Sequence, residues 1–134
     1  MAIKEANGDI SKIVTTAQQV AGKLDIYSGN DDQTVPILAL GGKGVISVLS
    51  NLLPAETAEM CHRFFRGDCA GAAELQLKYL PLIHALFSEV NPIPVKAAMA
   101  ELGFCENFLR MPLTPMEEDH KQKLFALMRE EGLI

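Results

Sequence analysis

Lys4 is the residue of this sequence whose side chain could do covalent chemistry, since it lies on a short apolar segment that runs into a turn. Alternation along a strand puts Ala2, Lys4 and Ala6 on one face, which leaves room for a ligand around the amine. A lysine amine attacks carbonyl carbons only as the free base, which in water at pH 7 is about one molecule in 2,500. Lys4 therefore predicts imine chemistry if its strand belongs to a closed barrel that keeps the amine dry; by itself it is an ordinary solvated lysine.

Alternating strand and helix patterns follow Lys4. Apolar residues recur at helical spacing between Gly8 or Asp9, as the cap, and Gly22, as the end. Asp31 and Asp32 suit the first turn of the next helix. The apolar run 45–48 suits a strand buried on both faces, as in parallel sheets, so the sequence predicts an α/β fold. The predicted elements are a strand around Lys4, a helix at 10–21, a strand at 24–28, a helix at 33–40 and a strand at 43–48.

Only helices are predicted beyond Leu53. Pro81 falls within the helical pattern and should kink or divide it. The run Thr114-Pro115-Met116-Glu117 matches a capping box at the start of the last helix. We therefore expect two regions, a partial barrel with its last three strands at 1–52 and the last barrel helix with a helical region at 53–134. The predicted helices run from Pro54 to near Gly67, from 68 to about 88, from 94 to 102 with Gly103 as the stop, and from Thr114 onward.

Composition and charge exclude several classes of function. The net charge of −5 includes no basic run that would indicate nucleic acid or a membrane surface. No apolar segment is long enough to span a membrane and no leader pattern is visible, so we expect a cytoplasmic protein. The odd, widely spaced cysteines indicate reduced thiols, and the scattered histidines lack ligands at metal-binding spacing, so no metal site is predicted. These residues are Cys61, Cys69 and Cys105, and His62, His84 and His120.

The sequence resembles the dihydrodipicolinate synthase family, Schiff-base-forming lyases built on the (β/α)8 barrel. Five blocks carry the likeness, in family order and at family-like separations, through nearly the whole chain. The blocks are Ile3-Lys4-Glu5-Ala6 with Gly8 and Asp9, Ser28-Gly29-Asn30-Asp31-Asp32, Leu40-Gly41-Gly42-Lys43-Gly44-Val45-Ile46-Ser47-Val48, Asn91-Pro92-Ile93-Pro94-Val95-Lys96, and Leu109-Arg110-Met111-Pro112-Leu113-Thr114-Pro115.

This resemblance implies the C-terminal half of such an enzyme: barrel strands six to eight followed by appended helices. Lys4 matches the lysine that forms an imine with pyruvate, whose enamine then attacks aspartate semialdehyde, with no cofactor. Gly29 matches the glycine beside bound pyruvate, and Ile46 the position whose backbone carbonyl faces the substrate, although its side chain alone indicates core. Asn7 and Asn30 replace common family residues, which weakens any prediction of how the substrate is oriented.

The family's proton relay, of two tyrosines and a threonine, and its arginine for the semialdehyde carboxylate fall outside the matched half. We therefore expect little or no turnover from this chain alone. Its partner would be the missing N-terminal barrel half or another copy of the chain, within a homo-oligomer. Two other functions stay open: a different pyruvate-dependent aldolase of the N-acetylneuraminate lyase superfamily, and a non-catalytic half-barrel assembly module.

Overall fold

The computed structural model describes all residues 1–134 and forms two compact units, Met1–Lys78 and Tyr79–Ile134. This division differs from the expected regions 1–52 and 53–134, which follow the type of element. Two helices beyond residue 52, α3 (Pro54–Phe65) and α4 (Cys69–Lys78), belong to the first unit because they pack against each other and against α2 (Thr34–Ala39).

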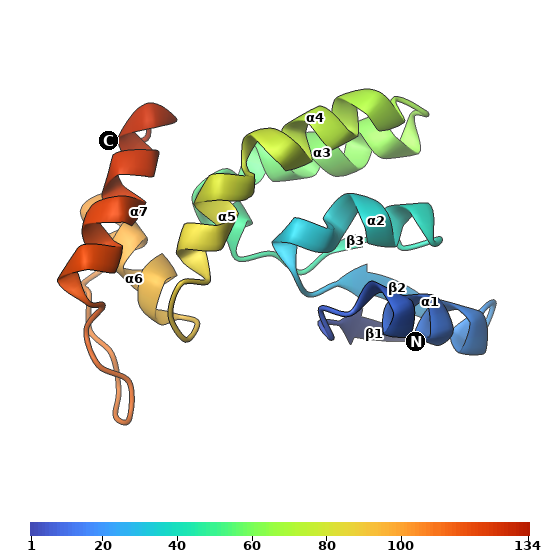
Figure 1. The fold of residues 1–134 in the computed structure, drawn as a ribbon, viewed down its shortest axis with the longest axis horizontal. Coiled ribbons are helices and arrows are strands. Elements are labelled where there is room, and N and C mark those ends of the chain that lie inside the picture. The colour runs from blue at the N-terminus through green and yellow to red at the C-terminus, as the bar shows by residue number, and fades with distance from the viewer. The chain divides into compact units, whose positions relative to one another are not determined.

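The first unit contains a parallel three-stranded sheet in the order β1-β2-β3, with β2 in the centre (Figure 1). The connection from β1 to β2 is α1, and the connection from β2 to β3 contains the 3-10 turn η1 and α2. This alternation confirms the predicted α/β class. The elements are β1 (Ala2–Glu5), α1 (Ile10–Val20), β2 (Asp25–Ser28), η1 (Asp31–Gln33) and β3 (Gly44–Val45).

Helices α1 and α2 cover one face of the sheet. Ile13 from α1, Ile26 from β2 and Ile37 from α2 form a buried cluster, against which Ile3 packs. Since side chains alternate along a strand, Lys4 lies on the opposite face, as the sequence predicts. The pattern that builds the core thus also turns the lysine away from it.

Strand β3 is much shorter than the predicted strand at 43–48. Pairing with β2 ends where Ser28 lies beside Val45, and the N–H of Ile46 donates the last bond, 2.8 Å from the carbonyl oxygen of Ser28. Val48 already has helical dihedral angles and leads into the 3-10 turn η2 (Leu49–Asn51). Strand β3 pairs only with β2, so it has no hydrogen-bonding partner beyond the end of β2. The apolar run therefore does not continue as sheet.

The second unit consists of α5 (Leu80–Leu86), α6 (Ile93–Glu101) and α7 (Glu118–Glu130), which pack on one another. Pro81 divides the long helical pattern as predicted, and it occupies the first turn of α5, where its missing N–H costs no hydrogen bond. No helix of the chain combines the length and hydrophobicity needed to cross a membrane. Side chains with less than 2% exposure in this unit include Leu82, Ile83, Leu86, Pro94, Ala98, Leu124 and Met128.

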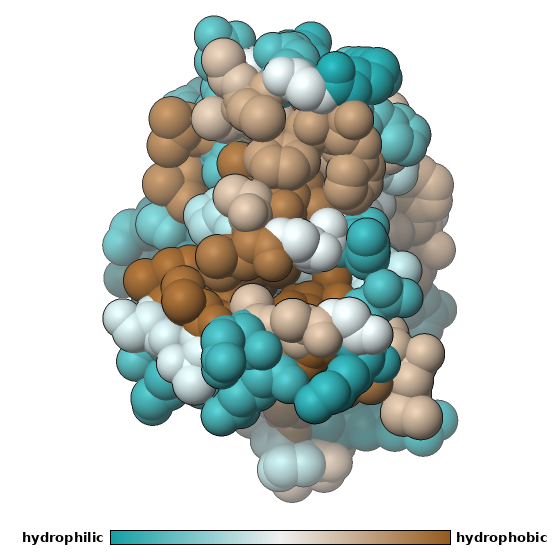
Figure 2. Space-filling view, turned by 90° about the vertical axis from the view of Figure 1, so that its right-hand side faces the viewer, coloured by the Kyte–Doolittle hydropathy of each residue, from teal (hydrophilic) through white to brown (hydrophobic).

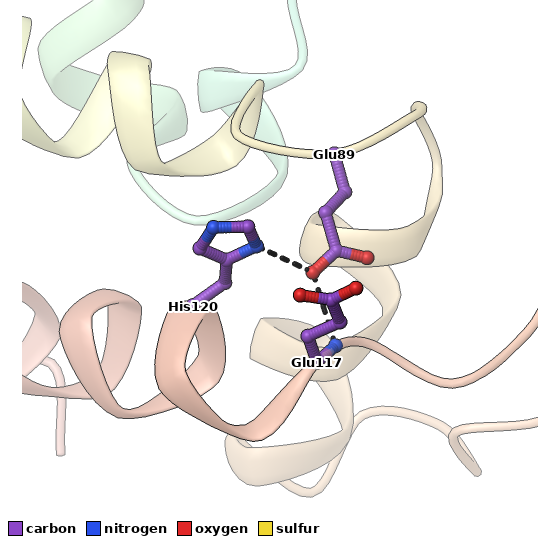
Figure 3. A group of neighbouring side chains, drawn as sticks. All are labelled: Glu89, Glu117 and His120. Carbon is purple, nitrogen blue, oxygen red and sulfur yellow. Dashed lines mark hydrogen bonds and ion pairs between the residues drawn. The ribbon is translucent and has the colours of Figure 1, made fainter.

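The predicted capping box at Thr114 is wrong. Helix α7 begins at Glu118, after an extended Glu117, and no side chain of its own cap position accepts a hydrogen bond. Thr114 stands four residues before Glu118, the first residue of the helix, which is too far for it to be the cap. The carboxylate that serves the helix start is instead Glu89, whose Oε1 accepts from the N–H of Glu117 at 3.0 Å and lies 2.9 Å from Nδ1 of His120 (Figure 3).

Glu89→Ala is expected to lower the free energy of unfolding of the second unit by about 1 kcal/mol, because it removes the acceptor at the start of α7 and a favourable charge at a helix N-terminus. Glu89→Gln keeps an oxygen for the N–H of Glu117 and should lose less. Urea unfolding followed by circular dichroism measures both variants. Equal losses in the two would mean that the oxygen acceptor contributes nothing.

Candidate active site

The site centres on Lys4, near the carboxyl end of β1. Its side chain is exposed on the face of the sheet that the helices leave uncovered. In the register of the sheet Lys4 lies beside Tyr27 of β2, so both side chains belong to this open face. Catalytic groups of (β/α)8 barrels gather at the carboxyl ends of the strands, which is where the amine lies. The chain by itself does not remove the amine from water.

Gly29 lies directly against the Lys4 side chain. It follows β2, is buried, and donates its N–H to the carbonyl oxygen of Glu5 at 2.7 Å. A Cβ atom at this position would lie 2.9 Å from Cε of Lys4 and 2.7 Å from Cβ of Ala6. Only glycine fits here without displacing a neighbour, so the lysine stem runs across bare backbone.

Ile46 follows the end of β3, and its backbone continues the ladder through its bond to Ser28. The expectation of a core side chain is wrong, because the Ile46 side chain is 50% exposed. The residue stands past the last paired position of a short edge strand, where no helix of the chain covers it. Lys4, Gly29 and Ile46 thus lie at the carboxyl ends of three adjacent strands.

Side chains that the sequence reading did not select connect the loops after these strands. Gln33 Nε2 donates to the carbonyl oxygen of Gly8 at 2.7 Å, which links the loop after β1 to η1. The carboxylate of Asp31 accepts from backbone N–H groups of the loop after β3. The sequence predicts Asp31 in the first turn of a helix, and the residue does open the 3-10 turn η1. No local pattern indicates its partner 17 residues away. The burial of the Asp31 carboxylate would have indicated a distant partner, but this burial is known only from the folded structure.

A hollow of about 430 Å³ lies away from these residues, between α1, β2 and the end of α2. It is at the amino ends of the strands, on the side that Figure 2 turns toward the viewer and where hydrophobic residues are visible among polar ones. Neither Lys4 nor Gly29 nor Ile46 lines it. The open face at the carboxyl ends, rather than this hollow, therefore carries the candidate chemistry.

The three cysteines are free thiols, with Cys61 buried and Cys69 and Cys105 exposed. Burial raises the pKa of the Cys61 thiol, so it stays protonated at neutral pH and is a poor nucleophile. The thiol therefore packs in the first unit and does not compete with Lys4 as the reactive group.

The expectation that no histidine has a cysteine or carboxylate at ligand spacing is wrong for His120. Donor atoms of Glu89, Glu117 and His120 lie within 4.8 Å of one another (Figure 3). Glu117 stands three residues before His120, a spacing visible in the sequence, whereas Glu89 comes from the segment after α5. Because Glu89 already binds both neighbours through one oxygen, the group is accounted for as the start of α7.

Residues 1–131 match the model of the dihydrodipicolinate synthetase family. Among curated proteins, a 4-hydroxy-tetrahydrodipicolinate synthase of Lachnoclostridium phytofermentans is 52% identical over 134 residues, which are 100% of this chain and 46% of that protein. The synthase of Thermotoga neapolitana is 47% identical over 98% of this chain and 46% of its own length. The chain thus spans about half the length of the curated relatives it matches.

Solved structures agree in fold. The dihydrodipicolinate synthase of Thermotoga maritima superposes with a TM-score of 0.95 at 45% identity, covering 99% of this chain and 46% of that one. The enzyme from Aquifex aeolicus gives a TM-score of 0.94 at 37% identity over 99% of this chain and 45% of that one. The three strands and their helices are therefore part of a (β/α)8 barrel. From its sequence blocks, its parallel strands and these matches, the chain belongs to the dihydrodipicolinate synthetase family and corresponds to its C-terminal half.

Proposed function

We propose that this chain is the lysine-bearing half of a 4-hydroxy-tetrahydrodipicolinate synthase, which condenses pyruvate with aspartate semialdehyde. The observation that carries the proposal is the Lys4 side chain lying across Gly29 at the carboxyl ends of parallel strands. Support for the synthase over another pyruvate-dependent aldolase comes from the curated relatives, which carry the synthase name at 47–52% identity.

The chemistry begins when Nζ of Lys4 attacks the keto carbon of pyruvate. Loss of water gives an imine, in which the nitrogen withdraws electrons from the carbon–carbon framework. Loss of a methyl proton then gives an enamine, whose terminal carbon forms a bond to the aldehyde carbon of the second substrate. In this proposal the backbone at Gly29 lies beside bound pyruvate, and the carbonyl of Ile46 faces it.

The reaction requires a partner that completes the barrel. Both β1 and β3 have β2 as their single neighbour, so each leaves an edge unpaired. An eight-stranded barrel needs five more strands, whereas a second copy of the chain would supply only three. A complementary five-stranded half, of the length by which the relatives exceed this chain, is therefore the partner we propose for the closed site, and the completed barrels would assemble as homo-oligomers.

Trapping tests the proposal. Incubation of the chain with pyruvate and then borohydride should add one reduced pyruvate to Lys4, because reduction makes even a sparsely populated imine permanent. Mass spectrometry of the intact chain and of its peptides locates the adduct. Lys4→Arg keeps the charge but should give no adduct, while Lys12→Arg, on α1, is the matched control and should trap like the parent. An adduct spread over several lysines would refute a special role for Lys4.

A further inference from the structure

Asp31 is a buried carboxylate to which the imine chemistry assigns no role. The residue is 2% exposed and follows β2 in η1. Its Oδ2 accepts hydrogen bonds from the N–H of Val48 at 2.8 Å and from the N–H of Leu49 at 3.0 Å. Its Oδ1 is buried and accepts from no group of the chain. A carboxylate is costly to hold in the interior, so its two bonds to the loop after β3 need a reason.

The backbone of Asp31 is fixed as firmly as its side chain. Gln76 of α4 donates from Nε2 to the carbonyl oxygen of Asp31 at 2.8 Å, and its Oε1 accepts from the N–H of Val35 at 3.1 Å. The hydroxyl of Thr34 donates to the same Asp31 oxygen at 3.0 Å. Gln76 and Thr34 are buried as well. The backbone of Asp31 is therefore held in place by other residues. The position of the loop after β3 depends on its hydrogen bonds to the Asp31 carboxylate.

The two loops joined in this way are the ones that carry the proposed pyruvate contacts. Asp31 is two residues after Gly29, and Val48 is two residues after Ile46. Sheet pairing between β2 and β3 ends at Ser28 and Val45, and the bond from the N–H of Ile46 to the carbonyl oxygen of Ser28 is the last of the ladder. Beyond Ile46, the bonds from the N–H groups of Val48 and Leu49 to the Asp31 carboxylate link the loop after β3 to the loop after β2.

We propose that Asp31 is a positioning residue: its carboxylate, together with the ladder bond from Ile46 to Ser28, fixes the loop after β3 against Gly29 and so sets the affinity of the site for pyruvate. The inference rests on the proposed function. Asp31 does not touch the reacting amine. Its loss should therefore weaken the binding of pyruvate without changing the reactivity of Lys4 once pyruvate is bound.

Hydrogen exchange tests whether the Asp31 carboxylate holds the N–H groups of Val48 and Leu49, a link that we call the clamp. This measurement needs no chemistry at Lys4. Asp31→Ala should accelerate amide exchange at Val48 and Leu49 while the amides of α3 keep their protection. Asp31→Asn retains an oxygen acceptor without the charge and should give an intermediate rate. Asp32→Ala is the matched control, because Asp32 is the exposed neighbour in the same turn, and it should exchange like the parent. Unchanged exchange at both amides in the Asp31 variants would overturn the clamp.

The effect on the site is tested by borohydride trapping at increasing pyruvate concentration. The half-saturating concentration should rise about tenfold in Asp31→Ala and about threefold in Asp31→Asn, with the yield at saturation unchanged. A role in stability alone would instead lower the yield and leave the half-saturating concentration unchanged, and that result would overturn the inference. If Asp31→Ala does not fold, Asp31→Asn decides by the same criterion.

The two proposals can fail separately. If the parent chain forms no adduct at Lys4, the proposed function fails, and hydrogen exchange at Val48 and Leu49 still decides whether Asp31 holds the loops. If the parent chain forms the adduct and the Asp31 variants bind pyruvate as it does, the positioning role fails while the proposed function stands.

Discussion

Gly29→Ala is expected to remove most of the pyruvate adduct at Lys4. The added Cβ would lie 2.7 Å from Cβ of Ala6 and 2.9 Å from Cε of Lys4. The lysine stem can move aside, but the Ala6 methyl is fixed to the backbone, so either the amine or the strand end must shift. Overpacking of this kind costs about 1–3 kcal/mol. Because the new methyl occupies the place beside the amine, we expect the loss to appear in trapping yield more than in thermal stability.

A compensating substitution gives this prediction its control. Gly29→Ala combined with Ala6→Gly moves one methyl group from residue 6 to residue 29 and removes the shortest contact, so it should recover part of the adduct. Trapping with borohydride and mass spectrometry measures both variants beside the parent. Full adduct formation by Gly29→Ala alone would mean that the close approach of Gly29 to Lys4 is not needed for the imine.

Local patterns predicted the elements whose residues interact with near neighbours in the sequence. The apolar spacing of α1 gave its position, because Ile13 must face the sheet and Gly22 has the positive φ of a helix end. The alternation of side chains along a strand placed Lys4 on the face opposite Ile3, because Ile3 packs against the core. Pro81 divided the helical pattern because of its own ring. In each case the physical cause lies within a few residues, where a sequence reading can find it.

The errors have causes that lie far away along the chain. Strand β3 ends early because its neighbour β2 ends, and Thr114 fails as a cap because Glu89, 28 residues before Glu117, takes the role. The bond of Asp31 to Val48 spans 17 residues. Tertiary contacts of this kind leave no periodicity in the sequence. Only the family-like blocks indicate an imine role for Lys4, since composition and spacing alone indicate a solvated lysine.

Addition of a complementary barrel half should convert this chain from an inactive protein into a working synthase. The exposed Lys4 lacks the enclosure that a completed barrel would give it. The resemblance also implies that the family's general acid-base residues, worth about 10²- to 10⁴-fold in rate, belong to the other half. We therefore expect no measurable turnover alone. The part of the Thermotoga maritima enzyme that this chain does not match is a suitable partner, since the matched part has a TM-score of 0.95.

The measurement is ring formation from pyruvate and aspartate semialdehyde in a titration of the chain with that partner half. Activity should saturate at a one-to-one ratio, because three strands and five make one barrel. Lys4→Arg should associate equally well and give no activity, which separates assembly from chemistry. The partner half alone gives the baseline. Turnover by the isolated chain would contradict the prediction, as would a stable complex of folded halves that stays inactive with Lys4 intact.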